Sequence, residues 1–278
     1  MRISICNELF QGWPIERVFD YAAQLGYDGV EISPFTLADS VLDVSPKRRE
    51  AIRRAAEKSG IKIVGLHWLL VKPEGFYINH PDEIIRIRTQ EYIEALIHFC
   101  ADIGGKYLLH GSPHQRTVKE GWDHGDAWTF AKETFDVCLK VAHKRNVIYC
   151  IEPLLRTSTN FINTVDEALR LVREINHPNF KMMFDCRNAS AQETSLIDAL
   201  LLALRSGHLR HIHINDANGK GPGFGETRFT PILKALSEDG YKGYLSVEVF
   251  PFDPDPQTVA SRSIGYLRGI LEAFSEKE

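Results

Sequence analysis

Short runs of apolar residues alternate along the whole chain with longer segments in which apolar positions recur every three or four residues. The short runs are typical of buried parallel strands, and the longer segments are typical of amphipathic helices. Eight strand and helix units follow from this pattern. The predicted strands are 2–8, 29–33, 62–68, 106–111, 147–153, 180–186, 209–216 and 243–250.

The segments between these strands carry the usual start and stop signals of helices. In PIERVFDYAAQLG the apolar periodicity stops at Gly26, and glycine is the residue that most readily ends a helix. In TVDEALRLVREI, Thr164 can cap the helix ahead of Asp166 and Glu167. These local signals agree with the apolar pattern.

Eight such units without a linker predict a single domain, residues 1–278, folded as an α/β (β/α)8 TIM barrel, which usually needs about 250 residues. An open doubly wound sheet is the alternative. It would more often show a G-x-G-x-x-G turn after its first strand, and CNELFQGWP has none. The segments 69–80 and 112–127 are predicted insertions above the carboxyl ends of the strands, where barrel chemistry occurs.

Composition and charge narrow the class of protein. Hydrophobic residues make up 44% and charged residues 25%, as in ordinary globular proteins with a sizeable core. The net charge of -4 gives no overall basic surface, so nucleic acid is not an expected partner. No run of about 18 apolar residues occurs, so we expect no membrane partner.

The cysteines and the N-terminal residues indicate the compartment. The five cysteines are far apart and include no C-x-x-C pair, which favours reduced core residues over a zinc or redox site. MRISICNELF begins as a strand and has no long apolar run of a signal peptide. We therefore expect a cytoplasmic protein.

Four metal-competent residues lie near the ends of the last four predicted strands: Glu152, Asp185, His213 and Glu248. They are about one strand and helix unit apart, so a barrel would bring them together at its active face. Three close carboxylates repel one another unless a cation or protons compensate. Three oxygen donors and one imidazole suit Mn²⁺, Mg²⁺, Co²⁺ or Zn²⁺. The alternative is that they are rim carboxylates in ordinary ion pairs with Arg156, Arg187 or Lys220.

Further polar and aromatic residues lie at the same strand ends. His211 and His213 share one strand face because strand side chains alternate. Aromatic residues at strand ends either form the wall of a small-ligand site or only pack. The residues concerned are Glu31, His67, Trp68 and His110, with Phe35, Trp68 and Phe250 as the candidate wall.

Several motifs together resemble one family: YDGVEIS, CIEP, TNFINT, FDCRN, HIHINDANGKGPGFGE and GYLSVEVF. With these motifs the chain resembles, nearly end to end, the xylose isomerase-like TIM barrels, also called the sugar phosphate isomerase/epimerase superfamily. The motif pattern is most similar to the ketose 3-epimerases of the D-tagatose 3-epimerase type. The motifs are specific for the superfamily and weak for the substrate.

The resemblance implies an isomerase, an epimerase of ketoses or related sugars, with one divalent metal ion held by Glu152, Asp185, His213 and Glu248. We expect Mn²⁺ first, with Mg²⁺, Co²⁺ or Zn²⁺ as alternatives. A metal stabilises the enediolate formed beside a carbonyl, and Glu152 and Glu248 would remove and return the proton. The implied substrate is a small sugar, a sugar phosphate or a polyol-derived compound. The implied assembly is a homodimer or homotetramer.

The candidate substrate-binding residues are His67, Trp68, His110, Arg156, Asn188, Lys220 and Glu226. Two positions depart from the ketose 3-epimerases. Asn188 stands where their D-x-x-H motif has a histidine, and Gly219 with Lys220 stands where they have an arginine. An amide can hydrogen-bond a hydroxyl but cannot titrate. The glycines of GKGPGFGE would let the loop turn over the barrel mouth and return Glu226 to the site, and phosphate binding by Lys220 is an alternative for this loop.

Other reactions stay open at this point. Aldose–ketose isomerase, hydroxypyruvate isomerase and inosose dehydratase activities would use the same proton abstraction beside a carbonyl. An apurinic endonuclease-like hydrolase would place His67, His110, Glu152, Asp185 and His213 in a three-zinc site, but Asn188 replaces a histidine that it requires. A sugar-binding barrel without catalysis is a further alternative, which the departures at Asn188 and Gly219 favour.

Overall fold

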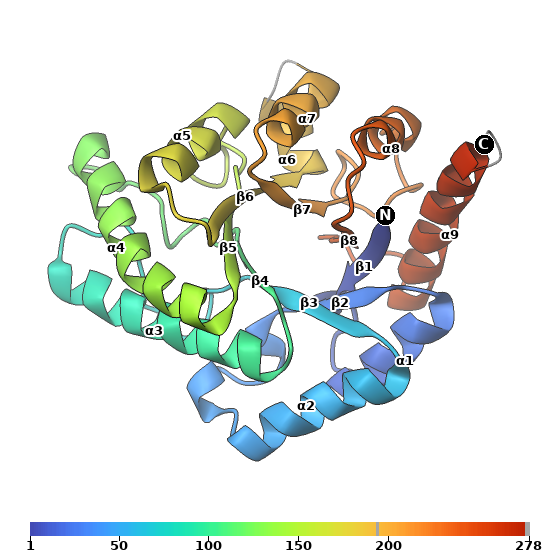
Figure 1. Ribbon diagram of the computed structural model, residues 1–278, viewed down its shortest axis with the longest axis horizontal. Helices are drawn as coiled ribbons and strands as arrows, with labels where there is room; N and C mark the ends of the chain where they lie inside the picture. The colour runs from blue at the N-terminus through green and yellow to red at the C-terminus, as the bar shows by residue number, and fades with distance from the viewer. Residues whose placement is uncertain (193–194, 276–278) are drawn as a thin grey trace.

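The computed structural model describes residues 1–192 and 195–275, and its eight parallel strands close into one barrel in chain order (Figure 1). Each strand pairs with its sequence neighbours, and β1 pairs with β8 to close the ring. The prediction of a single-domain TIM barrel is confirmed. The strands are β1 (Arg2–Cys6), β2 (Gly29–Ile32), β3 (Lys62–His67), β4 (Tyr107–His110), β5 (Ile148–Ile151), β6 (Phe180–Asp185), β7 (Leu209–His213) and β8 (Tyr244–Val247).

The helices surround the ring of strands, and the last of them packs beside the first (Figure 1). One strand, β6, is followed by two helices, α6 and α7, where the sequence pattern predicted one unit. The helices are α1 (Ile15–Leu25), α2 (Pro46–Ser59), α3 (Glu83–Asp102), α4 (His124–Arg145), α5 (Val165–Ile175), α6 (Cys186–Gln192), α7 (Leu196–Arg205), α8 (Phe229–Glu238) and α9 (Pro256–Ser275), with short 3-10 helices at Asn7–Leu9, Pro34–Thr36 and Val41–Asp43.

The predicted helix signals act as expected. Helix α1 ends at Gly26, whose φ of 88° lies in the left-handed region that glycine adopts without steric cost. Thr164 caps helix α5: its side chain accepts a hydrogen bond from the backbone N–H of Glu167, and the Glu167 side chain accepts one from the Thr164 backbone N–H. Local sequence therefore sets these helix boundaries.

Strands β5 and β8 end earlier than the sequence predicted, so two of the carboxylates lie just after a strand and not within it. β5 ends at Ile151 and β8 at Val247, so Glu152 and Glu248 each follow the last residue of a strand. Asp185 and His213 are the last residues of β6 and β7. The four side chains therefore start from one level of the barrel, at its carboxyl end.

The core has two layers. Leu109, Cys150 and Met183 form a small cluster inside the barrel, and a much larger cluster fills the space between strands and helices. All five cysteines are buried and free, which confirms the prediction of reduced core residues. Among the described residues, no helix has the length and apolar character needed to span a bilayer.

The two predicted insertions pack against each other above the barrel. The Ile78 N–H donates to the Gln115 carbonyl at 3.0 Å, and the Asn79 side-chain amide donates to the Arg116 carbonyl at 2.6 Å. The Leu70 N–H donates to the Ser112 hydroxyl at 3.2 Å. These bonds fix the loops in the absence of regular secondary structure, because each buried backbone group needs a partner.

Strands β3 and β4 approach each other so closely at one position that only glycine fits there. Gly65 lies in β3, and a Cβ added there would collide with the carbonyl of Tyr107 in β4. We expect Gly65→Ala to lower the free energy of unfolding by about 3 kcal/mol, because the backbone must move. Gly269→Ala in α9 is the matched control, since a Cβ there meets no atom within 4 Å. Equal urea midpoints for the two variants would refute this account.

Candidate functional site

The four predicted ligands converge at the carboxyl end of the barrel. One potential ligand atom from each of Glu152, Asp185, His213 and Glu248 lies within 4.8 Å of every other. All four side chains are buried. The His213 Nδ1 atom lies 3.0 Å from Glu248 Oε2 and 3.9 Å from Asp185 Oδ2. The cluster is thus compact enough to hold one metal ion.

The carboxylates of this cluster disturb one another. Burial raises the pKa of Glu152 well above its usual value, and the charges of Asp185 and Glu248 raise it further. Burial and the charge of Glu248 raise the pKa of Asp185 to about 6. Burial also acts to raise the pKa of Glu248, but the charge of His213 and its hydrogen bond outweigh this and lower the pKa. A single added cation would relieve this repulsion.

A buried carboxylate beneath the cluster fixes the orientation of His213. Glu31 in β2 lies 3.0 Å from His213 Nε2 and 2.6 Å from His211 Nε2, and its side chain is fully buried. With Nε2 turned to Glu31, Nδ1 is the ring atom that faces Glu248 and Asp185. A carboxylate that accepts one ring N–H of a histidine sets which nitrogen is free to bind a metal.

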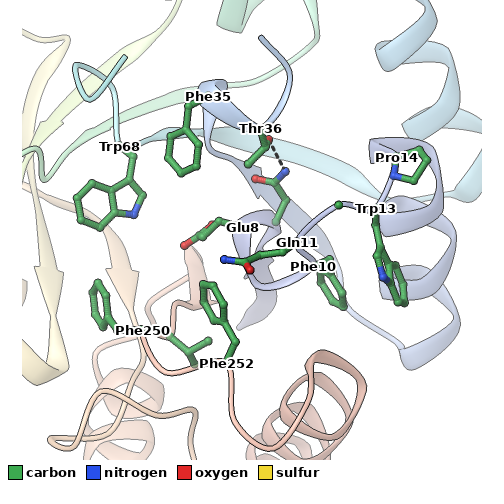
Figure 2. A pocket seen from close by; sticks show the side chains of 13 residues that line it. Glu8, Phe10, Gln11, Trp13, Pro14, Phe35, Thr36, Trp68, Phe250 and Phe252 are labelled. Carbon is green, nitrogen blue, oxygen red and sulfur yellow. Dashed lines mark hydrogen bonds between the residues drawn. The ribbon is translucent and has the colours of Figure 1, made fainter. Parts of the chain in front are cut away.

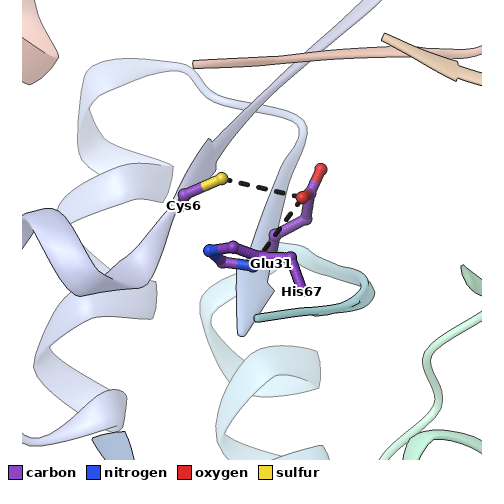
Figure 3. Close-up of side chains that lie close together, drawn as sticks. All are labelled: Cys6, Glu31 and His67. Carbon is purple, nitrogen blue, oxygen red and sulfur yellow. Dashed lines mark hydrogen bonds and ion pairs between the residues drawn. The ribbon is translucent and has the colours of Figure 1, made fainter. Parts of the chain in front are cut away.

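The same carboxylate reaches two further strands (Figure 3). Cys6 donates its thiol to Glu31 Oε2 across 3.6 Å, and His67 Nδ1 lies 3.9 Å from this oxygen. Glu31 thus joins β1, β2, β3 and β7 inside the barrel. Burial raises the pKa of the Cys6 thiol, and the nearby charge of Glu31 raises it further, so this cysteine stays a thiol.

The orientation of His213 can be tested through Glu31. We expect Glu31→Gln to weaken Mn²⁺ binding by about 10- to 100-fold, because the amide no longer fixes the imidazole with a charged acceptor. Titration calorimetry with Mn²⁺ measures this change. Glu57→Gln on the exposed outer surface of α2 is the control. Unchanged Mn²⁺ affinity in Glu31→Gln would contradict the orienting role.

Glu152 is held from two sides. The Asn188 side-chain amide donates to its Oε1 at 2.9 Å, and the Asn188 N–H donates to Asp185 Oδ1 at 2.6 Å. The fully buried Arg116 donates to the Glu152 carbonyl at 2.6 Å. Burial lowers the pKa of Arg116 to about 10, which leaves the guanidinium charged at neutral pH. Asn188 therefore positions two carboxylates of the cluster.

His67 links the cluster to an adjoining cavity. Its Nε2 lies 2.7 Å from Glu8 Oε2 and 2.9 Å from the Ser33 hydroxyl. Burial disfavours the charged imidazole, but the charge of Glu8 and its hydrogen bond outweigh burial and raise the pKa of His67. The ring of His67 is thereby fixed at the edge of the site.

Two neighbouring cavities at this end of the barrel share part of their lining. A narrow one of about 60 Å³ is lined by His67, Glu152, Asn188, His213 and Glu248. A wider one of about 630 Å³, here called the vestibule, adjoins it, and Trp68 and Phe250 line both. Figure 2 shows Trp68, Phe35 and Phe250 on one side of the vestibule and Trp13 on the other. The three aromatic residues predicted as a wall do line this space.

The structure brings together only some of the candidate substrate-binding residues. His67, Trp68 and Asn188 line the narrow pocket. His110 turns outward from β4, where it bonds the Tyr149 hydroxyl and packs edge-on against Phe135, because alternate strand residues face opposite layers. It lines neither cavity, so the structure does not support its expected contact with substrate.

The charged loop residues also lie apart from the cluster. Arg156 is exposed and lies 3.8 Å from Glu167 at the start of α5. The Lys220 ammonium donates to Asp253 at 2.8 Å, which ties the loop after β7 to the loop after β8. Glu226 is exposed, and it lines neither cavity. The expected return of Glu226 to the site is therefore absent from the described structure, because Gly223 packs against Tyr266 and Gly225 against Asp216 instead of placing Glu226 at the cavities.

Sequence reasoning missed three residues at the site. Arg187 lines the narrow pocket, Arg116 lies behind Glu152, and Glu8 binds His67. Arg187 was considered only as an ion-pair partner. The sequence held one indication that Glu8 faces the inside of the barrel: it is two residues after Cys6 and four after Ser4, and alternate strand residues share one face. The sequence held no such indication for Arg116, because this residue lies in an insertion without apolar periodicity.

Comparison with known proteins agrees with this geometry. The sequence model described as "Xylose isomerase-like TIM barrel" matches residues 19–270. The chain belongs to this family. The relatives described below are named as epimerases, which bears out the prediction of an isomerase of the epimerase type.

The similarity to known proteins extends over almost the whole chain. A D-psicose 3-epimerase of Ruminiclostridium cellulolyticum is 27% identical, over 95% of this chain and 89% of its own length. A 3-dehydro-D-guloside 4-epimerase of Escherichia coli is 25% identical, over 96% of this chain and 99% of its own. The solved structure of an L-ribulose 3-epimerase superposes with a TM-score of 0.86 at 19% identity, covering 99% of this chain and 96% of the other. The last likeness concerns the fold alone.

Proposed function

We propose that this protein is a divalent-metal-dependent ketose epimerase that moves a proton on the carbon beside a carbonyl. The observation that carries the proposal is the buried cluster of Glu152, Asp185, His213 and Glu248, of which Glu152, His213 and Glu248 line the narrow pocket. Its relatives named as 3- and 4-epimerases support the same reaction class. We further propose a cytoplasmic homodimer or homotetramer.

The residues of the cluster fit a divalent cation. Three mutually repelling carboxylates and one imidazole form a donor set suited to Mn²⁺, and Mg²⁺, Co²⁺ or Zn²⁺ would also be accepted. The His213 Nδ1 atom is buried and faces two carboxylates of the cluster, Glu248 Oε2 at 3.0 Å and Asp185 Oδ2 at 3.9 Å. A nitrogen turned toward the other candidate ligands in this way is what a metal ligand requires. When bound, the ion supplies Lewis-acid stabilisation of negative charge on the substrate oxygens.

The two glutamates are the proposed proton carriers. Glu152 follows β5 and Glu248 follows β8, with Asp185 and His213 on the two strands between them, so the glutamates flank the centre. One removes the proton from the substrate carbon, and the other returns a proton to the opposite face. Asn188 holds Glu152 by a hydrogen bond, and His213 holds Glu248 by an ion pair. His67 and Arg187 line the pocket and would bind substrate hydroxyls.

The structure favours an unphosphorylated sugar. Lys220, the residue considered for phosphate, is paired with Asp253 and lines neither cavity. The vestibule is instead lined mainly by aromatic and other apolar side chains, and its polar lining residues are Asn7, Glu8, Gln11 and Thr36, none of them cationic. Such walls suit the apolar faces of sugars more than a phosphate dianion.

The first test is the metal content of the purified protein after loading with Mn²⁺ and washing, followed by a panel of ketoses in D₂O. We expect about one ion per chain and exchange of a single C–H bond for deuterium, seen by NMR. Three zinc ions per chain would favour the endonuclease-like alternative. Binding of sugars with no exchange would favour a non-catalytic barrel, and absence of metal binding would refute the proposed centre.

A further inference from the structure

The vestibule is much larger than the reaction requires. One water molecule fills about 30 Å³ of liquid, so a hexose with twelve non-hydrogen atoms fills less than about 360 Å³. Even if the whole hexose lay in the 630 Å³ vestibule, about 270 Å³ of the vestibule would stay free. The reacting carbons must in addition reach the narrow pocket. A free monosaccharide therefore leaves part of the vestibule unfilled.

The lining of this space has the character of a binding surface. Figure 2 shows Phe10 and Trp13 on the side of the vestibule away from Trp68, and Phe252 between them and Phe250. Gln11 extends between Glu8 and Phe252, and its amide makes no hydrogen bond to another described residue. Aromatic faces with a free amide at hand match a sugar ring, which has apolar C–H faces and a rim of hydroxyls.

We propose that the natural substrate is a ketose that carries a second, glycosidically linked sugar ring, and that this ring occupies the vestibule against Trp13, Phe252 and Gln11. The reacting carbons of the ketose reach the narrow pocket, and the link between the two rings lies along Trp68 and Phe250, which line both cavities and pack edge-on with their ring centroids 6.4 Å apart. This inference rests on the proposed function for the ketose end, but the binding of the second ring does not depend on turnover.

The test compares matched sugars on the Mn²⁺-loaded protein. D-Fructose is compared with isomaltulose and lactulose, in which fructose carries a hexose on O6 or O4. We expect at least one disaccharide to exceed fructose at least tenfold, both in kcat/KM for exchange in D₂O and in affinity by calorimetry. If neither exceeds fructose in affinity, the second-ring site is refuted, whatever the exchange results are.

A filling variant locates the second ring. Gln11 is exposed, so Gln11→Trp should fold while filling the vestibule. We expect it to lower the affinity ratio of disaccharide to fructose at least tenfold. Lys58→Trp at the exposed end of α2 is the matched control and should leave the ratio unchanged. An unchanged ratio in Gln11→Trp would overturn the placement.

The two proposals can fail separately. Preference for the disaccharide in binding, with no exchange of any sugar, would support the second-ring site and refute the epimerase. Exchange of fructose with no preference for either disaccharide would support the epimerase and refute the second-ring site. An apolar aglycone as true occupant would appear as tighter binding of an aryl glycoside than of either disaccharide, and would likewise refute a sugar ring.

Discussion

Glu248→Gln is expected to lower the rate of solvent proton exchange into a ketose substrate by about 10²- to 10⁴-fold, which is the usual contribution of a general acid or base. The amide has nearly the shape of the carboxylate but cannot accept the proton. The buried Glu248 lies beside His213, so the variant keeps a polar partner for the imidazole. NMR in D₂O at saturating Mn²⁺ measures the rate, so that weaker metal binding does not disguise the result.

Glu57→Gln is the control for this prediction, because Glu57 lies exposed on α2. Circular dichroism should show the same folded content in both variants. If Glu248→Gln exchanges protons at the rate of the unchanged protein with saturating metal, Glu248 is not a proton carrier. The pair of carriers would then have to be sought among the other groups of the narrow pocket.

Asp185→Asn is expected to remove the stabilisation that Mn²⁺ gives to the folded protein. A ligand at 100 times its Kd stabilises the state that binds it by about 2.7 kcal/mol. Asp185 contributes a carboxylate to the centre and accepts hydrogen bonds from Asn188 and Asn215. The amide variant keeps an acceptor but loses the charge that a divalent ion requires. Thermal unfolding with and without Mn²⁺ measures the difference.

Asp239→Asn at the exposed end of α8 is the matched control and should retain the full Mn²⁺-dependent rise in melting temperature. An equal rise in Asp185→Asn would show that the ion binds elsewhere. The clusters that share Glu31 or Glu8 with His67 would then be the next candidates, since each gathers three groups that could hold a metal.

The sequence by itself determined the barrel and the four central residues. Apolar runs of strand length between amphipathic helices are local signals, and Gly26 and Thr164 end and begin their helices as expected. The spacing of Glu152, Asp185, His213 and Glu248 by about one unit each could be read because a closed barrel brings successive strand ends together. In this regular fold, residues that are one strand and helix unit apart in the sequence lie on neighbouring strand ends.

Only the tertiary structure decided the surroundings of these residues. His110 and His67 both end strands, yet one faces outward to Tyr149 and the other inward to Glu8, because their strands differ in phase. Arg116 reaches Glu152 from an insertion whose course follows from its contacts with another insertion. The vestibule is built from the loops after β1, β2, β3 and β8, which meet only after the ring has closed. Loop conformation depends on such distant contacts, so no local pattern in the sequence encoded it.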